Sequence, residues 1–151
     1  VGGFPESVRS FIQGTDGDRE ETIRNKFSID GEAVYGRRVW VTDDSIVRGK
    51  TSKSLVSSLR KNGASWVGML SGSPPIIGPC GKGIDLSHLI AGNVPGGGEV
   101  DIEAVRKSIG ADFLGYLPLE ELKAAVDECG ACHRNYCFGC FEGKEPIWGK
   151  W

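Results

Sequence analysis

The sequence predicts an α/β fold, with part of a parallel sheet, flanking helices and a helical, cysteine-rich tail. Two apolar runs with strand-type residues, 38–42 and 65–70, are separated by an amphipathic helical pattern at 51–61. A strand, a helix and a strand in that order imply two parallel strands joined by a right-handed crossover. Four cysteines in two Cys-x-x-Cys pairs mark the tail as a separate unit of the chain.

Composition agrees with a globular domain and excludes several function classes. The chain has 151 residues, 39% of them hydrophobic and 25% charged, which is ordinary usage for a domain with a moderate core. Its net charge of -2 does not suggest a nucleic-acid or anionic-membrane partner. Its apolar runs are far shorter than the roughly 20 residues of a transmembrane helix. We therefore expect a cytoplasmic protein with neither nucleic acid nor membrane as partner.

The strand predicted at 38–42 leads directly into two acidic residues. Val39, Trp40 and Val41 suit a buried pleated surface, and Asp43 and Asp44 follow them. Carboxyl ends of parallel strands are where open α/β sheets bind ligands. Adjacent carboxylates repel each other and attract cations, so they suit Mg²⁺ or the hydroxyls of a ribose.

The helix predicted at 51–61 begins directly after a small polar loop. Leu55, Val56 and Leu59 share one face, Thr51 or Ser52 is available as N-cap, and Asn62-Gly63 provides the stop. The free N–H groups and the positive dipole end of such a helix point at the loop and favour phosphate. We therefore predict a phosphate-binding loop made by Ser45, Ile46, Val47, Arg48, Gly49, Lys50, Thr51 and Ser52.

Two other interpretations of this segment compete. Asp-Asp-Ser can be an ordinary solvated turn before a capped helix. Gly49-Lys50-Thr51 is also the end of a Walker A loop, whose first glycine would have to be Asp44. A carboxylate at that position would repel the phosphates that a Walker A loop surrounds, which disfavours ATP as the ligand. The unbroken order of strand, acid pair, loop and helix favours a phosphorylated sugar.

The remaining elements are predicted from local patterns. Ser73-Pro74-Pro75 should break the chain after the second strand. Leu119, Leu122 and Val126 share one face of a helix. The helices expected outside the strand–helix–strand unit are residues 18–26, 86–91, 99–109 and 119–128.

The cysteine pattern predicts a metal centre. Cys129-x-x-Cys132 and Cys137-x-x-Cys140 each place two thiolates on one tight turn, which suits Zn²⁺ or an iron–sulfur cluster. Cys80 is a lone fifth thiol. Disulfides are the alternative, which a cytoplasmic setting disfavours. His133 could be a further ligand or an exposed turn residue.

The loop and the tail together resemble one enzyme family. Asp43-Asp44-Ser45-Ile46-Val47-Arg48-Gly49 followed by Thr51-Ser52 resembles the phosphoribosyl pyrophosphate (PRPP) loop of type I phosphoribosyltransferases, and closely that of the amidophosphoribosyltransferases. The similarity extends upstream to Arg9-Ser10-Phe11-Ile12-Gln13 and downstream to Cys137-x-x-Cys140-Phe141-x-Gly143, which covers nearly the whole chain. Lys50 departs from the family, which usually has Thr there.

This resemblance implies a domain plan. Residues 1–32 would be a flexible lid, 33–117 the C-terminal half of a type I phosphoribosyltransferase fold, and 118–151 a helix with a cysteine-rich metal-binding tail. Family members also carry a glutaminase domain and a first half of the sheet. We therefore expect the C-terminal part of a longer or split enzyme, with a glutaminase domain or subunit as partner and a homo-oligomer as the full assembly.

The resemblance also implies a reaction. Mg²⁺-bound PRPP would place its ribose hydroxyls on Asp43 and Asp44 and its 5-phosphate in the loop 45–52. Ammonia from glutamine would displace pyrophosphate to give 5-phosphoribosylamine, the first step of de novo purine biosynthesis. Arg19 and Lys26 would be lid cations that reach the pyrophosphate, although they also fit a solvated helix face.

For the cysteines, the resemblance implies a structural [4Fe–4S] cluster. Cys80, Cys137 and Cys140 match three family ligands, and the fourth would come from upstream of this chain or from Cys129 or Cys132. A self-contained zinc site of the four tail cysteines is the alternative. Two other functions stay open: a regulatory module that binds PRPP or purine nucleotides without catalysis, and a zinc-binding interaction module.

Overall fold

The computed structural model describes residues 29–78, 88–92 and 98–144. Arg19, Lys26 and Cys80 lie outside these residues, as do the expected helix 18–26 and most of the expected lid. No helix within the described ranges is long and apolar enough to cross a membrane. The elements in chain order are α2 (Gly31–Val34), β1 (Arg38–Asp43), α3 (Lys50–Lys61), β2 (Trp66–Ser71), α4 (Ile102–Ile109), β3 (Phe113–Tyr116), α5 (Leu119–Glu128), η1 (His133–Asn135) and α6 (Gly139–Glu142).

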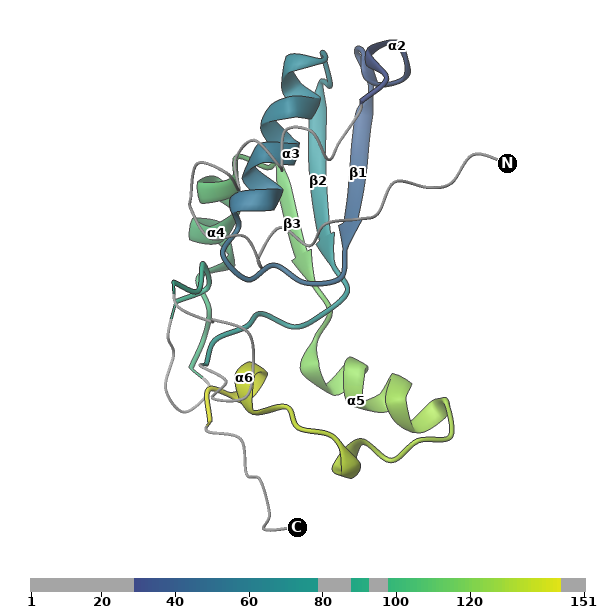
Figure 1. The fold of residues 1–151 in the computed structure, drawn as a ribbon, viewed down its shortest axis with the longest axis vertical. Helices are drawn as coiled ribbons and strands as arrows, with labels where there is room; N and C mark the ends of the chain where they lie inside the picture. Colours follow the sequence, from purple (N-terminus) through teal and green to yellow (C-terminus); the bar gives the residue numbers. More distant parts are fainter. Residues whose placement is uncertain (1–28, 79–87, 93–97, 145–151) are drawn as a thin grey trace, which may run out of the picture.

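The three strands form one parallel sheet in the order β1-β2-β3 (Figure 1). Asp43 pairs with Ser71, and Ser71 pairs with Tyr116, so all three strands end in the same row. The predicted parallel pair is therefore confirmed, as is the α/β fold class. The sequence patterns did not predict β3, because it is only four residues long and includes a glycine.

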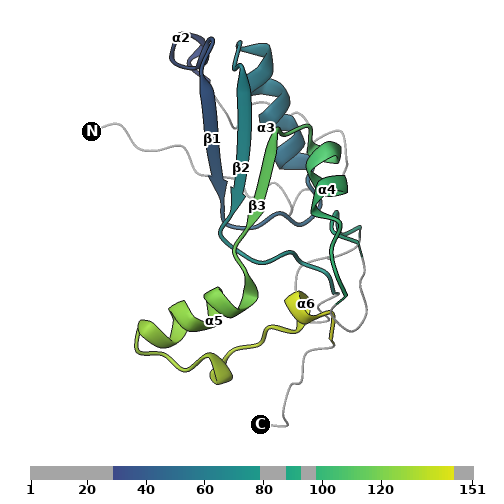
Figure 2. The same ribbon diagram turned by 180° about the vertical axis from the view of Figure 1, so that it is seen from behind.

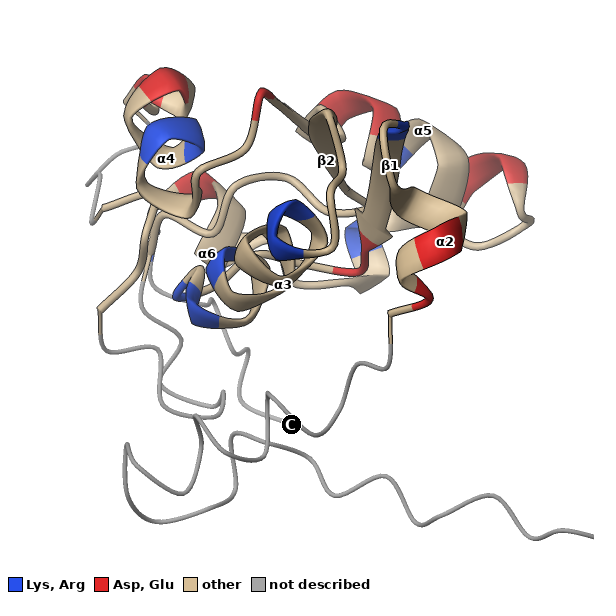
Figure 3. Ribbon diagram, turned by 90° about the horizontal axis from the view of Figure 1, so that it is seen from above, with Lys and Arg blue, Asp and Glu red and all other residues tan. Residues whose placement is uncertain are grey.

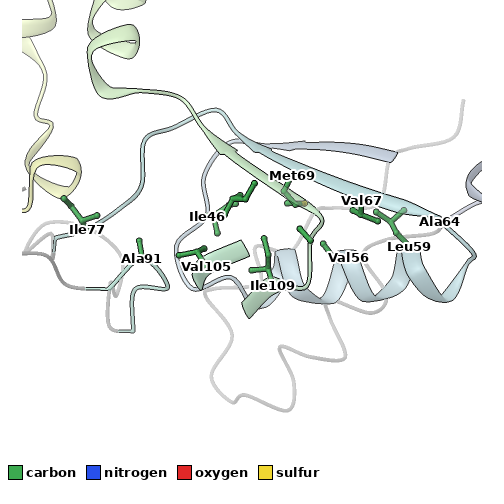
Figure 4. Packing of buried hydrophobic residues seen from close by; sticks show 12 residues of the cluster. Ile46, Val56, Leu59, Ala64, Val67, Met69, Ile77, Ala91, Val105 and Ile109 are labelled. Carbon is green, nitrogen blue, oxygen red and sulfur yellow. The ribbon is translucent and has the colours of Figure 1, made fainter. Parts of the chain in front are cut away.

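Helices α3 and α4 cover one face of the sheet and form the core with it (Figure 4). Val56 from α3 and Ile109 from α4 are 1% exposed, and Val67 and Met69 from the central strand are fully buried. These residues alternate or recur at the spacing of their element, which places one apolar side of each element inward. The core therefore holds α3 and α4 against one face of the sheet.

Both ends of α3 are set by glycines. The helix begins at Lys50, and Gly49 is its N-cap in the left-handed region, so the expected caps Thr51 and Ser52 are wrong. Both residues lie within the first turn. The helix ends at Lys61 with Asn62 as C-cap and Gly63 at φ 87°, as the sequence predicted.

Two other predicted helices required correction. Residues 88–91 of the predicted helix 86–91 are not helical, and His88 has φ 63°, a left-handed conformation that interrupts a helix. Helix α4 starts later than the predicted residue 99, because the Asp101 carboxylate accepts the Ala104 N–H at 2.9 Å and caps it there. Helix α5 has the predicted bounds, Leu119–Glu128.

The C-terminal elements lie beyond the carboxyl end of the sheet (Figure 2). Lys123 of α5 donates to Glu142 of α6 at 3.2 Å and to Glu120 at 3.0 Å, and its ammonium lies 5.7 Å from the centre of the Phe138 ring. The hydrogen bonds from Lys123, followed by those from Lys144, lower the pKa of Glu142. One lysine thus ties the tail to α5.

Asp112 joins three elements at the amino end of the sheet. Its Oδ2 accepts the Val67 N–H at 2.7 Å and the Arg60 guanidinium at 2.8 Å. Arg60 also donates to the Gly110 carbonyl at 3.1 Å. Burial acts to raise the pKa of Asp112, but the Val67 N–H and then the Arg60 guanidinium outweigh it, so this pKa lies below its ordinary value.

Replacing Asp112 with Asn should lower the free energy of unfolding by about 1–3 kcal/mol at neutral pH, because the charge-assisted bond to Arg60 is lost. Since the folded pKa is depressed, the contribution is present above the ordinary value of 3.8 and is lost as pH falls through the folded pKa. Urea titrations of both proteins at several pH values measure this. Glu121→Gln on the exposed side of α5 is the control, and an equal loss at pH 7 and pH 2 would contradict the assignment.

Candidate functional site

The acid pair lies where β1 ends and turns the chain out of the sheet. The Asp43 carbonyl still accepts the Gly72 N–H at 2.8 Å, which ties it to the end of β2. Asp43 Oδ1 accepts the Asp44 N–H at 3.0 Å, and Asp44 Oδ1 accepts the Ser45 N–H at 2.6 Å. These backbone bonds orient the two carboxylates at the end of β1. Asp43 is half-buried and Asp44 is exposed.

Gly49 occupies a position in the loop that has no room for a side chain. Its φ of 69° disfavours other residues, and it is buried. A Cβ there would lie 2.1 Å from Ile90 Cδ1 and 3.2 Å from Ile109 Cγ2. The Val47 carbonyl accepts the Ile90 N–H at 2.8 Å, and Ile46 is only 2% exposed. The loop is therefore anchored in the core on its inner side, which holds its shape without a ligand.

The loop leads directly into the start of α3. Within the part of the chain that the structure describes, no side chain caps this helix. The first N–H groups of a helix lack partners within it, and they carry the positive end of the helix dipole. Arg48, Lys50 and Lys53 add cationic side chains, and no acidic residue occurs from 45 to 61 (Figure 3). This arrangement favours an anion with several oxygens, such as a phosphate.

A phenol at the same row of the sheet was missed by the sequence patterns. Tyr116 ends β3 and packs against the core, and its hydroxyl is buried without a hydrogen-bond partner among the described residues. Burial raises the pKa of Tyr116 to about 12, so the hydroxyl is neutral at physiological pH. Only the pairing of β3 with β2 brings this residue to the carboxyl edge.

Residues 43–52 run from the end of β1 into the first turn of α3, whereas the tail cysteines are not gathered into one group among the described residues. Cys129, Cys132 and Cys137 are exposed and Cys140 is half-buried. Among the described residues, no group of three or more His, Cys, Asp or Glu side chains is placed to hold a metal ion. Cys80, the remaining sequence-predicted ligand, lies outside the described residues.

His133 has a local partner. Its Nδ1 lies 2.7 Å from Asp127 Oδ2, and its backbone N–H donates to Asp127 Oδ1 at 2.8 Å. The backbone bond, followed by the side-chain bond, lowers the pKa of Asp127. These two contacts between His133 and Asp127 hold the turn after α5 in place, so a structural role is sufficient to explain His133.

The backbone of Cys140 is joined to the segment that precedes Cys80 in sequence. The Cys140 carbonyl accepts the N–H groups of Ile77 at 2.9 Å and Gly78 at 3.0 Å. A Cβ on Gly78 would lie 3.0 Å from the Gly143 Cα, so the two backbones are in close contact. Cys80 follows Gly78 by two residues in the sequence. The tail and residues 77–78 are therefore joined through their backbones.

The chain is an α/β protein: its first parallel strand ends in an acid pair, and a loop with a left-handed glycine leads from there into a helix start that no described side chain caps. Comparison with known proteins gives the family. The chain is 42% identical over 142 residues to the amidophosphoribosyltransferase of Archaeoglobus fulgidus and 40% identical over 147 residues to that of Bacillus subtilis. These matches include 92% and 91% of this chain. The chain is thus homologous, over almost its whole length, to part of amidophosphoribosyltransferase. No family profile matches it.

Solved structures agree with this assignment. A Bacillus subtilis glutamine PRPP amidotransferase complexed with ADP and GMP superposes with a TM-score of 0.66 at 39% identity, over 93% of this chain. A structure described as the allosteric regulatory enzyme of purine biosynthesis gives 0.61 at 35% identity. The chain spans only about 30% of these proteins and of the Archaeoglobus relative. The fold class and the family resemblance are confirmed.

Gly49→Ala should lower the free energy of unfolding by about 2–5 kcal/mol, since it adds left-handed backbone strain to a steric overlap with Ile90. Gly130→Ala is the matched control, because Gly130 has φ 81° with no atom within 4 Å of the added Cβ. It should show the strain alone, about 1–2 kcal/mol. Thermal and urea unfolding of both variants measure the difference. Equal losses would show that Ile90 does not pack on the loop as described.

Proposed function

We propose that this chain forms the PRPP-binding part of an amidophosphoribosyltransferase, an enzyme of the phosphoribosyltransferase type. The observation that carries the proposal is the continuous segment 43–52, in which an acid pair, a glycine-shaped turn and an uncapped helix start follow one strand. Homology to amidophosphoribosyltransferases over 92% of the chain supports the same ligand. Activity would require the rest of the family polypeptide, because this chain spans about 30% of it.

The two ends of the segment would bind different parts of PRPP. Asp43 and Asp44 would accept hydrogen bonds from the ribose hydroxyls. Their oxygen donors also fit Mg²⁺, a hard cation that would neutralise charge on the pyrophosphate. The backbone N–H groups at the start of α3, with the hydroxyls of Ser45, Thr51 and Ser52, would hold the 5-phosphate. Lys50 would add a cation to that phosphate.

Catalysis of this reaction would require the site to position the ribose and to stabilise the charge that develops during the reaction. Ammonia released from glutamine would attack the anomeric carbon, and the bond to pyrophosphate would break with its electron pair leaving on the pyrophosphate. Loss of a proton then gives 5-phosphoribosylamine. The site's task is to hold the ribose in place while positive charge develops on the sugar. We assign Arg19 and Lys26 to the departing pyrophosphate from the family resemblance. Residues 1–32 would form the lid over 33–117.

Asp43→Asn and Asp44→Asn should each weaken PRPP binding about ten- to a hundred-fold, because a hydrogen bond to a charged group contributes about 1.5–3 kcal/mol, and the double variant should abolish measurable binding. Calorimetric titration of Mg²⁺ and PRPP into each variant, beside Mg²⁺ and ATP, measures this. Glu121→Gln is the charge-matched control outside the site and should bind as the unmodified chain does. Unchanged PRPP affinity in both aspartate variants would refute the site, and ATP binding that depends on Lys50 would revive the Walker A interpretation.

For the tail we propose a structural [4Fe–4S] cluster held by Cys80, Cys137 and Cys140. Cys140 is supported by its backbone contact with Gly78, two residues before Cys80. A soft thiolate set fits such a cluster, which would cross-link the loop after β2 to the tail. The fourth ligand would come from upstream of this chain, or from Cys129 or Cys132. Zinc bound by the four tail cysteines is the rival.

Serine substitutions separate these two metal sites. Cys137→Ser and Cys140→Ser should abolish iron incorporation during anaerobic reconstitution with iron and sulfide, since each removes a thiolate ligand. Cys129→Ser and Cys132→Ser are the matched pair on the neighbouring motif. If only the first pair matters, neither Cys129 nor Cys132 is a ligand. If all four variants lose tightly bound zinc and none affects iron, the zinc site is correct. Iron, sulfide and zinc analysis measures both outcomes.

A second candidate is a regulatory module that binds purine nucleotides at the same loop without turnover. It is favoured by the bacterial homologue that was solved with ADP and GMP. Nucleotide binding that is lost in Asp43→Asn, together with no PRPP turnover in the complete assembly, would support it. A zinc-binding interaction module is the third candidate, and loss of partner binding on zinc removal would identify it.

A further inference from the structure

Lys123 contacts the part of the tail that carries the second cysteine pair, residues 137–142, which we call the cysteine segment. Its ammonium donates to the Glu142 carboxylate at 3.2 Å, two residues after the second cysteine of the pair. The same ammonium lies 5.7 Å from the centre of the ring of Phe138, which directly follows the first cysteine. Because this lysine comes from α5, a separate helix contacts a residue near each cysteine of the pair.

The contact between Lys123 and Glu142 is partly shielded from water. The Lys123 side chain is 19% exposed and that of Glu142 is 30% exposed, whereas Glu120, the other partner of the same lysine, is 84% exposed. Salt and water screen an exposed ion pair more strongly than a partly buried one. The pair with Glu142 is therefore the less screened of the two, although its distance of 3.2 Å is longer than the 3.0 Å to Glu120.

The segment that follows β2 holds the cysteine segment from the core. The Cys140 carbonyl accepts the N–H groups of Ile77 and Gly78, and Ile77 is only 4% exposed within the hydrophobic core. This backbone connection therefore fixes the cysteine segment to the core that lies under the sheet. The cysteine segment is held between the core and α5, and none of these contacts uses a cysteine side chain.

We propose that Lys123 is a positioning residue for the metal centre, because it holds the cysteine segment in place against α5 before a metal binds. This role rests on the proposed cluster at Cys137 and Cys140, and Lys123 itself is not a ligand. The thiols are not gathered with further ligands among the described residues, so the positioning concerns the backbone that carries them. Ligands on a backbone that is already held lose less conformational freedom on binding, which slows release of the metal.

The first measurement uses the metal-free chain and follows alkylation of each thiol by iodoacetamide with mass spectrometry. The half-buried Cys140 should react roughly five-fold faster in Lys123→Met and in Glu142→Gln, because the cysteine segment opens more often without this charge-assisted bond. Cys129 is exposed and lies outside the cysteine segment, so its rate is the internal standard. Glu120→Gln is the matched control, because it removes the other carboxylate bound by the same lysine and should leave Cys140 unchanged.

The second measurement uses the chain after anaerobic reconstitution with iron and sulfide. Iron release to a chelator should be roughly five-fold faster in Lys123→Met and in Glu142→Gln than in the unmodified chain, and unchanged in Glu120→Gln. Lys123→Arg keeps a cation that can contact both a carboxylate and an aromatic ring, so it should retain iron as the unmodified chain does. Equal iron release in all of these variants would overturn the proposal, even if Cys140 reacted faster, because Lys123 would then hold the tail without affecting the metal.

Failure of the cluster and failure of the role of Lys123 give different results. If the unmodified chain takes up no iron, the proposed cluster and the role of Lys123 are both refuted. If the unmodified chain takes up iron but Lys123→Met changes neither the alkylation of Cys140 nor the release of iron, only the role of Lys123 is refuted. Circular dichroism shows whether each variant is folded, and substitutions at two sites, Lys123 and Glu142, prevent one unfolded variant from deciding the result.

Discussion

The shared end row of the three strands is the constraint on which the rest of the structure depends. Parallel pairing of Asp43 with Ser71 and of Ser71 with Tyr116 makes every strand stop in the same row. The chain must then leave the sheet three times at one edge, and the acid pair, the loop after β2 and the start of α5 all gather there. A register shift of one residue would move Val67 and Met69 from the core to the opposite face of the sheet.

Packing and binding are coupled at the loop. Ile46 and Gly49 point its inner side into the same core that holds α3 and α4, while Asp44 and the start of α3 remain on its outer side. The shape of the proposed phosphate site is therefore maintained by apolar contacts, so no binding energy is needed to form it. Lys50 adds a cation at that site, at a position where the resemblance leads one to expect Thr.

The two faces of the sheet differ in whether described helices cover them. One carries a finished core under α3 and α4, and the other carries the packed aromatic rings of Trp40, Trp66 and Phe113, which no described helix covers. The chain spans about 30% of its Archaeoglobus relative. The tail shows a similar feature, because its backbone is joined to residues 77 and 78 while its cysteine side chains are not gathered among the described residues.

The sequence by itself determined the α/β class, the first two strands, α3, α5 and the continuous segment 43–52, because hydrophobic period and local spacing encode all of these. Only the tertiary structure decided the rest. Strand β3 is too short to have a period, and it exists through its pairing with β2. Helix α3 begins at Lys50 with Gly49 as its N-cap, and Ile90 and Ile109 from distant parts of the chain leave no room for a side chain at that residue. The aromatic face of the sheet likewise forms only when three separate strands are aligned, since no local pattern says which side of a sheet is covered.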